Sequence, residues 1–245
     1  MHKVRRFKMK KSRVFLAGVL IFLSLTGTSV ASTILELQQS RGIWTSATPT
    51  TPSVQQFISG LGTNQINWGL GVDHDFLNND WGTQSGLLFD GVGASSLTTD
   101  QVFNIGSLTH FNNPIITNTA AEQAFLQIDL AFSFPAGLGT KSFNFEFDIF
   151  ETPNNPVDVA DIITFPQSFA SETFILDNTT YTLELIGFGP DINNLDLDRF
   201  VSEEGQNNST SLWGKITLNP VPEPSTMILF GVGLLGLGAL GRRKN

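Results

Sequence analysis

The feature that most constrains the fold is a regular alternation of apolar and polar residues through the middle of the chain. In residues 124–134, Gln127, Asp129 and Ser133 separate a set of apolar residues, which are Leu126, Ile128, Leu130, Phe132 and Phe134. Residues 142–150 repeat the pattern with Phe143, Phe145, Phe147 and Ile149. A period of two puts successive side chains on opposite faces of a strand. These segments therefore predict strands with one face in a core, and we expect Phe132, Phe134, Phe143, Phe145 and Phe147 to be buried.

Shorter alternating segments and frequent turn residues extend this prediction to the whole middle of the chain. Residues 181–185 and 212–218 alternate in the same way, and Asp177-Asn178 separates two such runs as a hairpin turn would. Proline, glycine and asparagine interrupt the pattern at 135–137 and 153–156. Several short strands joined by turns predict an all-β fold, an antiparallel β-sandwich of the jelly-roll type.

The N-terminus has the organisation of an export signal. Seven basic residues lie within the first 13 positions, an apolar run follows at 14–25, and Ser29-Val30-Ala31 supplies small residues for a cleavage site. An apolar run of this length is too short to span a membrane and fits a signal peptide. Residues 1–31 are therefore predicted to be a signal peptide.

The C-terminus is predicted to be a second targeting segment in three parts. Residues 221–226 read Val-Pro-Glu-Pro-Ser-Thr, residues 227–241 carry no charge, and 242–245 form a basic end. As a helix, 227–241 would be about 22 Å long, slightly short of a ~30 Å hydrocarbon core. We expect a transmembrane helix there, with the basic end kept in the cytoplasm. Residues 32–220 then remain as one extracellular β-sandwich domain.

Charge is strongly partitioned between the ends and the middle. Residues 32–221 contain four basic and 21 acidic residues, a net charge of −17. So acidic a domain repels nucleic acid and attracts cations, and we expect no nucleic-acid partner. The chain has no cysteine, which excludes disulfides, thiolate metal sites and cysteine nucleophiles.

The C-terminal segment closely resembles the PEP-CTERM sorting signal. The residues that carry the resemblance are Val221, Pro222, Glu223 and Pro224, followed by the uncharged run and the basic end. The resemblance implies that an exosortase, a membrane protease-transpeptidase of Gram-negative bacteria that make exopolysaccharide, is a partner. It also implies a protein that is held at the membrane by its tail at first and then released to the cell surface or the extracellular space.

A second resemblance lies in residues 106–115. This segment resembles the signature of the THxN family of PEP-CTERM proteins at Thr109, His110 and Asn112, and the choice-of-anchor K domain with its Thr-His-Phe-Asn-x-Pro-Ile sequence. The resemblance implies an extracellular β domain and no known enzymatic activity.

The residues themselves favour a structural role for His110. Only His74 and His110 remain after removal of the signal, so a three-histidine zinc site is excluded. In a strand, His110 shares a face with Leu108, opposite Thr109. We expect His110 to fix a turn through hydrogen bonds to the side chain of Thr109 or Asn112, or to nearby backbone, and we predict no catalytic residue.

Two acidic loops are candidate calcium sites. Oxygen ligands from alternating Asp and Asn residues suit Ca²⁺, which takes 6–8 of them, although neither loop has the EF-hand pattern. The candidate ligands are Asp73, Asp75, Asp191, Asn193 and Asp196. Solvated acidic loops without an ion remain the alternative, and no other cofactor is expected.

The sequence favours a non-enzymatic surface or matrix protein that is associated with exopolysaccharide. A calcium-dependent carbohydrate-binding module using exposed tryptophans is the first alternative, and an exopolysaccharide hydrolase is the second. Exposed Trp44, Trp68, Trp81 or Trp213 would support the former. Two carboxylates facing each other across a cleft would support the latter, whereas Glu146 and Asp148 share the polar face of one predicted strand.

Overall fold

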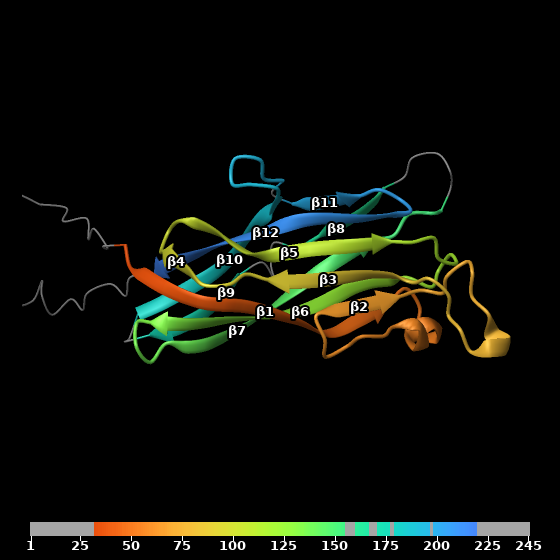
Figure 1. Cartoon of the computed structure of the whole chain (residues 1–245), viewed down its shortest axis with the longest axis horizontal. Coiled ribbons are helices and arrows are strands. Elements are labelled where there is room, and N and C mark those ends of the chain that lie inside the picture. Colours follow the sequence, from red (N-terminus) through yellow and green to blue (C-terminus); the bar gives the residue numbers. More distant parts are fainter. Residues whose placement is uncertain (1–31, 155–159, 167–170, 177–178, 197, 220–245) are drawn as a thin grey trace, which may run out of the picture.

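The computed structural model describes residues 32–154, 160–166, 171–176, 179–196 and 198–219, and these form an elongated sandwich of two antiparallel sheets (Figure 1). The first sheet has the order β11-β8-β7-β6-β1-β4. Its strands are β1 (Ile34–Pro49), β4 (Ser95–Thr98), β6 (Ala121–Phe134), β7 (Gly139–Phe150), β8 (Asp161–Thr164) and β11 (Arg199–Ser202).

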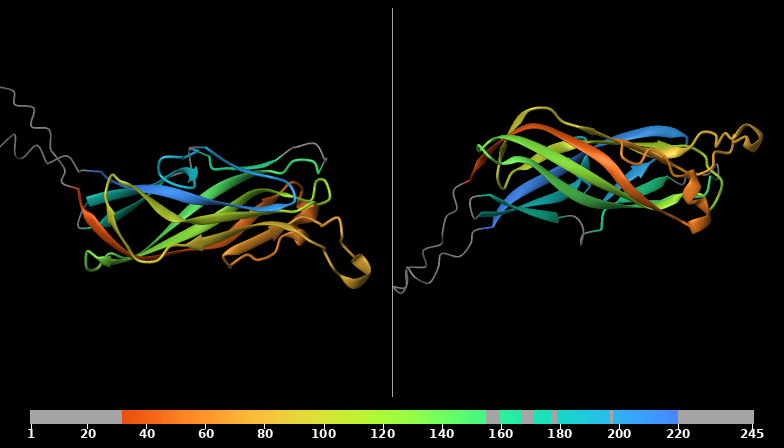
Figure 2. Two further views of the ribbon diagram at one scale, coloured as in Figure 1. Left: turned by 45° about the horizontal axis from the view of Figure 1, so that its top comes forward. Right: turned by 90° about the horizontal axis from the view of Figure 1, so that it is seen from below.

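The second sheet has the order β2-β3-β5-β12-β10-β9. Its strands are β2 (Gln65–Trp68), β3 (Ser85–Gly91), β5 (Val102–Asn112), β9 (Ser171–Leu176), β10 (Thr179–Gly189) and β12 (Gln206–Asn219). Two short 3₁₀ helices, Pro52–Phe57 and Phe76–Asn78, lie in the connections around β2. The two layers of strands are separated most clearly when the molecule is turned (Figure 2).

The predicted antiparallel sandwich is confirmed, but two parts of the fold prediction are corrected. The chain alternates between the sheets along β3–β6 and β10–β12, but sequential strands pair within one sheet at β2-β3, β6-β7, β7-β8 and β9-β10, so the regular alternation of a jelly roll is interrupted. The predicted C-terminal transmembrane helix is not supported. The described part of the chain contains no helix long and apolar enough to cross a membrane, and residues 227–241 lie outside it.

The core between the sheets is built from the alternating residues, as the pattern predicted. Phe143, Phe145 and Phe147 of β7 are at most 1% exposed, and Phe147 contacts the rings of Trp44, Phe165 and Phe188. Burial of each such ring contributes about 1.5–3 kcal/mol. The core therefore stabilises the sandwich without any disulfide.

One predicted core residue is not buried. Phe132 is 5% exposed, but Phe134 is 54% exposed, and the buried-exposed alternation of β6 ends at Ser133. The register between β1 and β6 shifts at this point, where Glu36 pairs with Phe134 and Leu37 with Phe132. A register irregularity redirects the side chains that follow it, and a sequence pattern does not reveal it.

The described chain begins and ends at one end of the sandwich. The start of β1 and the end of β4 lie near the end of β12, because Thr99 N donates to the Thr33 carbonyl and Asp100 N donates to the Ile216 carbonyl. Figures 1 and 2 show the first and last described strands leaving at this same end. The end of β5 lies at the opposite end of β12, since Asn112 pairs with Gln206.

Candidate functional site

The residues Thr109 and His110 point to opposite sides of β5. His110 is fully buried between the sheets, whereas Thr109 faces outward and its hydroxyl lies 2.7 Å from Ser209 Oγ on the neighbouring β12. Because successive side chains of a strand alternate, adjacent motif residues have different surroundings. The expected placement of Thr109 and His110 on opposite faces is confirmed.

His110 is held by residues distant in sequence. Its Nδ1 lies 2.8 Å from Ser202 Oγ at the end of β11, and its ring stacks on Trp68 of β2 with 5.7 Å between centroids. Asn112 Nδ2 donates to the backbone oxygen of Ser202 at 2.9 Å. The expectation that His110 fixes a turn through the side chain of Thr109 or Asn112, or through nearby backbone, was wrong: His110 and Asn112 join the second sheet to the first.

Two carboxylates from the first sheet meet His110. Glu151 follows the last residue of β7, and its Oε1 and Oε2 accept from Ser85 Oγ at 3.3 Å and Trp68 Nε1 at 3.1 Å. Asp161 begins β8, is 0% exposed, and accepts at Oδ1 from the backbone N and Oγ1 of Thr152. Ligand atoms of His110, Glu151 and Asp161 all lie within 4.8 Å of one another.

Burial sets the protonation of this group. It raises the pKa of Glu151 to about 8, with a further contribution from the charge of Asp161. Burial also raises the pKa of Asp161 and of Glu204, and lowers the pKa of His110 to about 4. Desolvation disfavours the charged form of every member, so a site with no positive charge inside it favours neutral groups.

Unpartnered polar atoms are concentrated here. Among the described residues, six buried side-chain atoms have no hydrogen-bond partner, and five belong to this group. The five are His110 Nε2, Asn112 Oδ1, Asp161 Oδ2, Glu204 Oε1 and Glu204 Oε2. Buried polar atoms normally have partners, so this concentration requires an explanation. We call His110, Asn112, Glu151, Asp161 and Glu204 the inter-sheet cluster.

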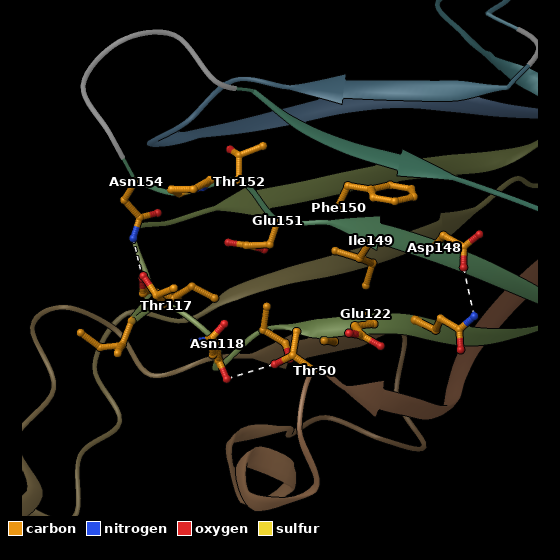
Figure 3. A pocket seen from close by; sticks show the side chains of 16 residues that line it. Thr50, Thr117, Asn118, Glu122, Asp148, Ile149, Phe150, Glu151, Thr152 and Asn154 are labelled. Atoms are coloured by element: carbon orange, nitrogen blue, oxygen red, sulfur yellow. Dashed lines mark hydrogen bonds between the residues drawn. The ribbon is translucent and has the colours of Figure 1, made fainter.

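A pocket of about 600 Å³ adjoins the inter-sheet cluster. It lies where the start of β6 and the end of β7 meet residues 115–118, and Glu151 belongs to its lining. Figure 3 shows Glu151 and Ile149 on one side of this strand end, with Phe150 and Thr152 on the other. Glu151 is therefore the residue that the pocket and the cluster share.

The predicted calcium ligands Asp73 and Asp75 lie in a solvent-accessible turn and bond to different residues, rather than lying around a common centre. Asp73 accepts from the backbone N and Oγ1 of Thr83, both at 2.7 Å. Asp75 accepts from the backbone N of Leu77 at 2.9 Å and from Asn78 Nδ2 at 2.6 Å. These hydrogen bonds lower the pKa of both carboxyl groups.

The second predicted calcium loop is organised in the same way. Asp191 accepts from the backbone N of Asn193 and from Asn194 Nδ2, and the hydrogen bonds lower its pKa. Asp196 lies 3.5 Å from the Arg199 guanidinium. Within the described ranges, the group of three metal-ligating side chains that converges is His110, Glu151 and Asp161, and neither loop contributes to it.

The surface features expected of the two alternative functions differ from those observed. Trp44 and Trp68 are 0% exposed, and Trp81 and Trp213 are half-buried, so no tryptophan forms an open platform. Gln123 Nε2 donates to Asp148 at 3.1 Å and also contacts Glu146, which places this carboxylate pair side by side on one strand face. They do not face each other across a cleft.

Sequence reasoning missed Glu151, Asp161, Ser202 and Glu204. They lie 41 to 94 positions after His110 and carry no shared spacing. The one local signal is Asp161, which directly precedes the apolar run Ile162-Ile163 and so occupies a strand face that a charge seldom occupies.

Fold and site together define a class: an antiparallel β-sandwich with a buried acid-histidine cluster between its sheets at one end. Comparison with protein families gives the particular feature: a PEP-CTERM protein-sorting motif matches at residues 220–244. Val221, Pro222, Glu223 and Pro224 lie within this match and outside the described residues.

The sorting motif indicates an exported protein that is processed by an exosortase and sorted to the cell surface or the extracellular space. A comparison with curated proteins found no match. The resemblance of 106–115 to the THxN and choice-of-anchor K families is not confirmed by these comparisons.

Proposed function

We propose that this protein is a non-enzymatic component of the cell surface or extracellular matrix that associates with exopolysaccharide after sorting by the exosortase. The sorting motif at 220–244 is the observation that carries the proposal, because its resemblance implies a host that makes exopolysaccharide. Removal of residues 1–31 as a signal peptide belongs to the same proposal.

The position of the pocket relative to the C-terminal end of β12 supports this role. The described chain ends with β12, next to the sorting motif, and the 14 residues of β12 span roughly 40 Å. The pocket and the inter-sheet cluster lie toward the other end of β12, where Asn112 pairs with Gln206. If the exosortase acts at the C-terminus, the pocket therefore lies at the end of the sandwich away from the site of processing.

Carbohydrate binding through the pocket is the second candidate. Hydroxyl, amide and carboxylate side chains line it, including Thr50, Asn118, Glu122 and Asp148 (Figure 3). A few polar groups among apolar ones are typical of small-ligand pockets. The acidic lining and the net charge of −17 oppose an anionic polysaccharide, so the expected ligand is a neutral or amino-sugar glycan.

Binding and sorting are tested separately. The purified chain should co-sediment with insoluble host exopolysaccharide and release no reducing ends from it. A Glu122→Gln/Asp148→Asn variant should bind more weakly if the pocket is used, while Asp73→Asn, which does not belong to the pocket lining, serves as the control. Deleting the host exosortase should prevent delivery of the protein to the matrix.

Two results would overturn the proposal. Release of reducing ends by the wild-type chain would make it a hydrolase. Equal matrix delivery with and without the exosortase, together with no sedimentation, would leave no role in the polysaccharide layer.

A further inference from the structure

The inter-sheet cluster brings several hydrogen-bond acceptors together, and five of their atoms have no partner. Asn112 Nδ2 points to the Ser202 carbonyl, which directs the amide oxygen Oδ1 to the unpartnered side. Asp161 and Glu204 add carboxylate oxygens without partners. Acceptors brought together in a water-poor interior repel one another unless a proton or a cation lies between them.

From this arrangement we propose that His110, Glu151 and Asp161 bind one divalent transition-metal ion between the two sheets, with Asn112 and Glu204 completing its surroundings. The ligand atoms of the three residues lie within 4.8 Å of one another. Ligands of a tetrahedral ion with ~2.1 Å bonds are about 3.4 Å apart, so an inward movement of each ligand atom by less than about 1 Å brings all three into contact with the ion.

A second set of hydrogen bonds already orients the ligands. Ser202 Oγ accepts from Asn208 Nδ2 at 2.9 Å and lies 2.8 Å from His110 Nδ1, where it can accept from the Nδ1–H tautomer or donate to the other one. Binding of an ion requires the Nδ1–H tautomer. That tautomer leaves the lone pair of Nε2 free. Trp68 and Thr152 likewise donate to Glu151 and Asp161. Ligand side chains held from behind in this way are typical of protein metal sites.

The ligand types select the kind of ion. One imidazole nitrogen disfavours Ca²⁺ and Mg²⁺, which prefer oxygen ligands, while the carboxylates and the absence of thiolate disfavour Cu⁺. Two carboxylates and a neutral imidazole balance the charge of a dication. Zn²⁺ and Mn²⁺ fit this mixed set, and they are the ions to test.

Such an ion would act as a structural tie. His110 and Asn112 belong to β5 of one sheet, whereas Asp161 heads β8 and Glu151 follows β7 of the other. An ion between them joins the sheets at the end of the sandwich away from the sorting motif. Because an ion that binds only the folded state adds to its stability, the effect is measurable by unfolding.

The test is thermal unfolding of the full-length chain after EDTA treatment and dialysis, with ZnCl₂, MnCl₂, CaCl₂ or MgCl₂ added back. Zn²⁺ or Mn²⁺ at a free concentration about 100 times its Kd should raise Tm by about 5–10 °C. Glu151→Gln and Asp161→Asn keep the size of the side chain. In these variants the same rise in Tm should require an ion concentration more than about 100-fold higher. Asp73→Asn and Asp191→Asn should respond as the wild type does.

Co²⁺ provides a readout that stability does not affect. Its visible absorption should show coordination by nitrogen and oxygen in the wild type, and this signal should be lost in His110→Gln. If no ion raises Tm, and Glu151→Gln is at least as stable as the wild type, the cluster is a network of protonated carboxyl groups and the proposal is wrong. A shift that survives in Asp161→Asn would place the ion elsewhere and equally overturn it.

Discussion

The inter-sheet cluster and the two acidic turns contain the same kinds of side chain in opposite circumstances. In the turns, Asp75 and Asp191 bond to residues two and three positions further on, and hydrogen bonds lower their pKa. In the cluster, Glu151 and Asp161 meet His110 from the other sheet, and burial raises their pKa.

This comparison shows which of the carboxylates requires a cation or a proton beside it. A carboxylate that its own turn supplies with N–H donors is stable as an anion in water. A carboxylate buried beside other acceptors is not, and it must be protonated or matched by a cation. Local density of Asp in a sequence therefore indicates a turn at least as well as a metal site.

The largest difference in stability is expected between a variant that lacks a carboxylate of the inter-sheet cluster and one that lacks a carboxylate of an acidic turn. Asp161→Ala should lower the free energy of unfolding of the metal-loaded protein by about 3–5 kcal/mol, because the ion and the donors of Thr152 lose their acceptor. Asp191→Ala, in the exposed turn, should have a much smaller effect. Chemical denaturation of both variants measures this, and equal losses would remove the distinction between the two regions.

The next largest effect separates two adjacent residues of β5. His110→Ala should cost about 2–4 kcal/mol, since it opens a cavity beside Trp68 and removes one of the two partners of Ser202 Oγ. Thr109→Ala removes an outward contact with Ser209 and should cost about 1 kcal/mol or less. Melting curves of the pair provide the check, and a costlier Thr109→Ala would show that the outer face matters more.

A matched pair of tryptophans isolates one hydrogen bond. Trp68→Phe removes the donor to Glu151 Oε2, and Trp213→Phe removes the donor to the Gly189 carbonyl. In the metal-loaded protein, where Glu151 is ionised, the first should cost about 1–3 kcal/mol because a buried carboxylate loses its partner, and the second about 0.5–1.5 kcal/mol. Urea denaturation distinguishes them, and the reverse order would mean that Glu151 is not charged in the folded protein.

A last pair of variants tests Ser202, which contacts the side of the His110 ring away from the other ligands. Ser202→Ala should weaken Zn²⁺ or Mn²⁺ binding about 10–100-fold, because it removes the group that orients the imidazole. Ser209→Ala, which affects only the partner of Thr109, should leave the affinity unchanged. Isothermal titration of both variants with the same ion would contradict the positioning role if the two affinities fell equally.

The sequence predicts the strands far better than it predicts this cluster. Alternation over 142–150 placed Phe143, Phe145 and Phe147 in the core, and Asp177-Asn178 marked a hairpin whose flanking residues Leu176 and Thr179 do pair. These are local patterns. The prediction that Phe134 is buried was wrong because a register shift between two strands cannot be deduced from the sequence of either strand alone.

The cluster is harder to foresee because the sheet topology assembles it. His110 was singled out from its motif, but its neighbours Glu151, Asp161 and Ser202 come from the ends of three other strands. Only the pairing of β8 with β11 and the packing of the two sheets bring Asp161 and Ser202 beside His110. No spacing rule in a single sequence expresses that contact.

The most direct measurement is a crystal structure of the full-length chain grown with Zn²⁺ or Mn²⁺, with anomalous scattering recorded at the absorption edge of the ion. The account predicts one strong anomalous peak at about 2.0–2.3 Å from His110 Nε2 and from carboxylate oxygens of Glu151 and Asp161. An absent peak, or a peak only at Asp73 and Asp75 or at Asp191 and Asp196, would contradict it.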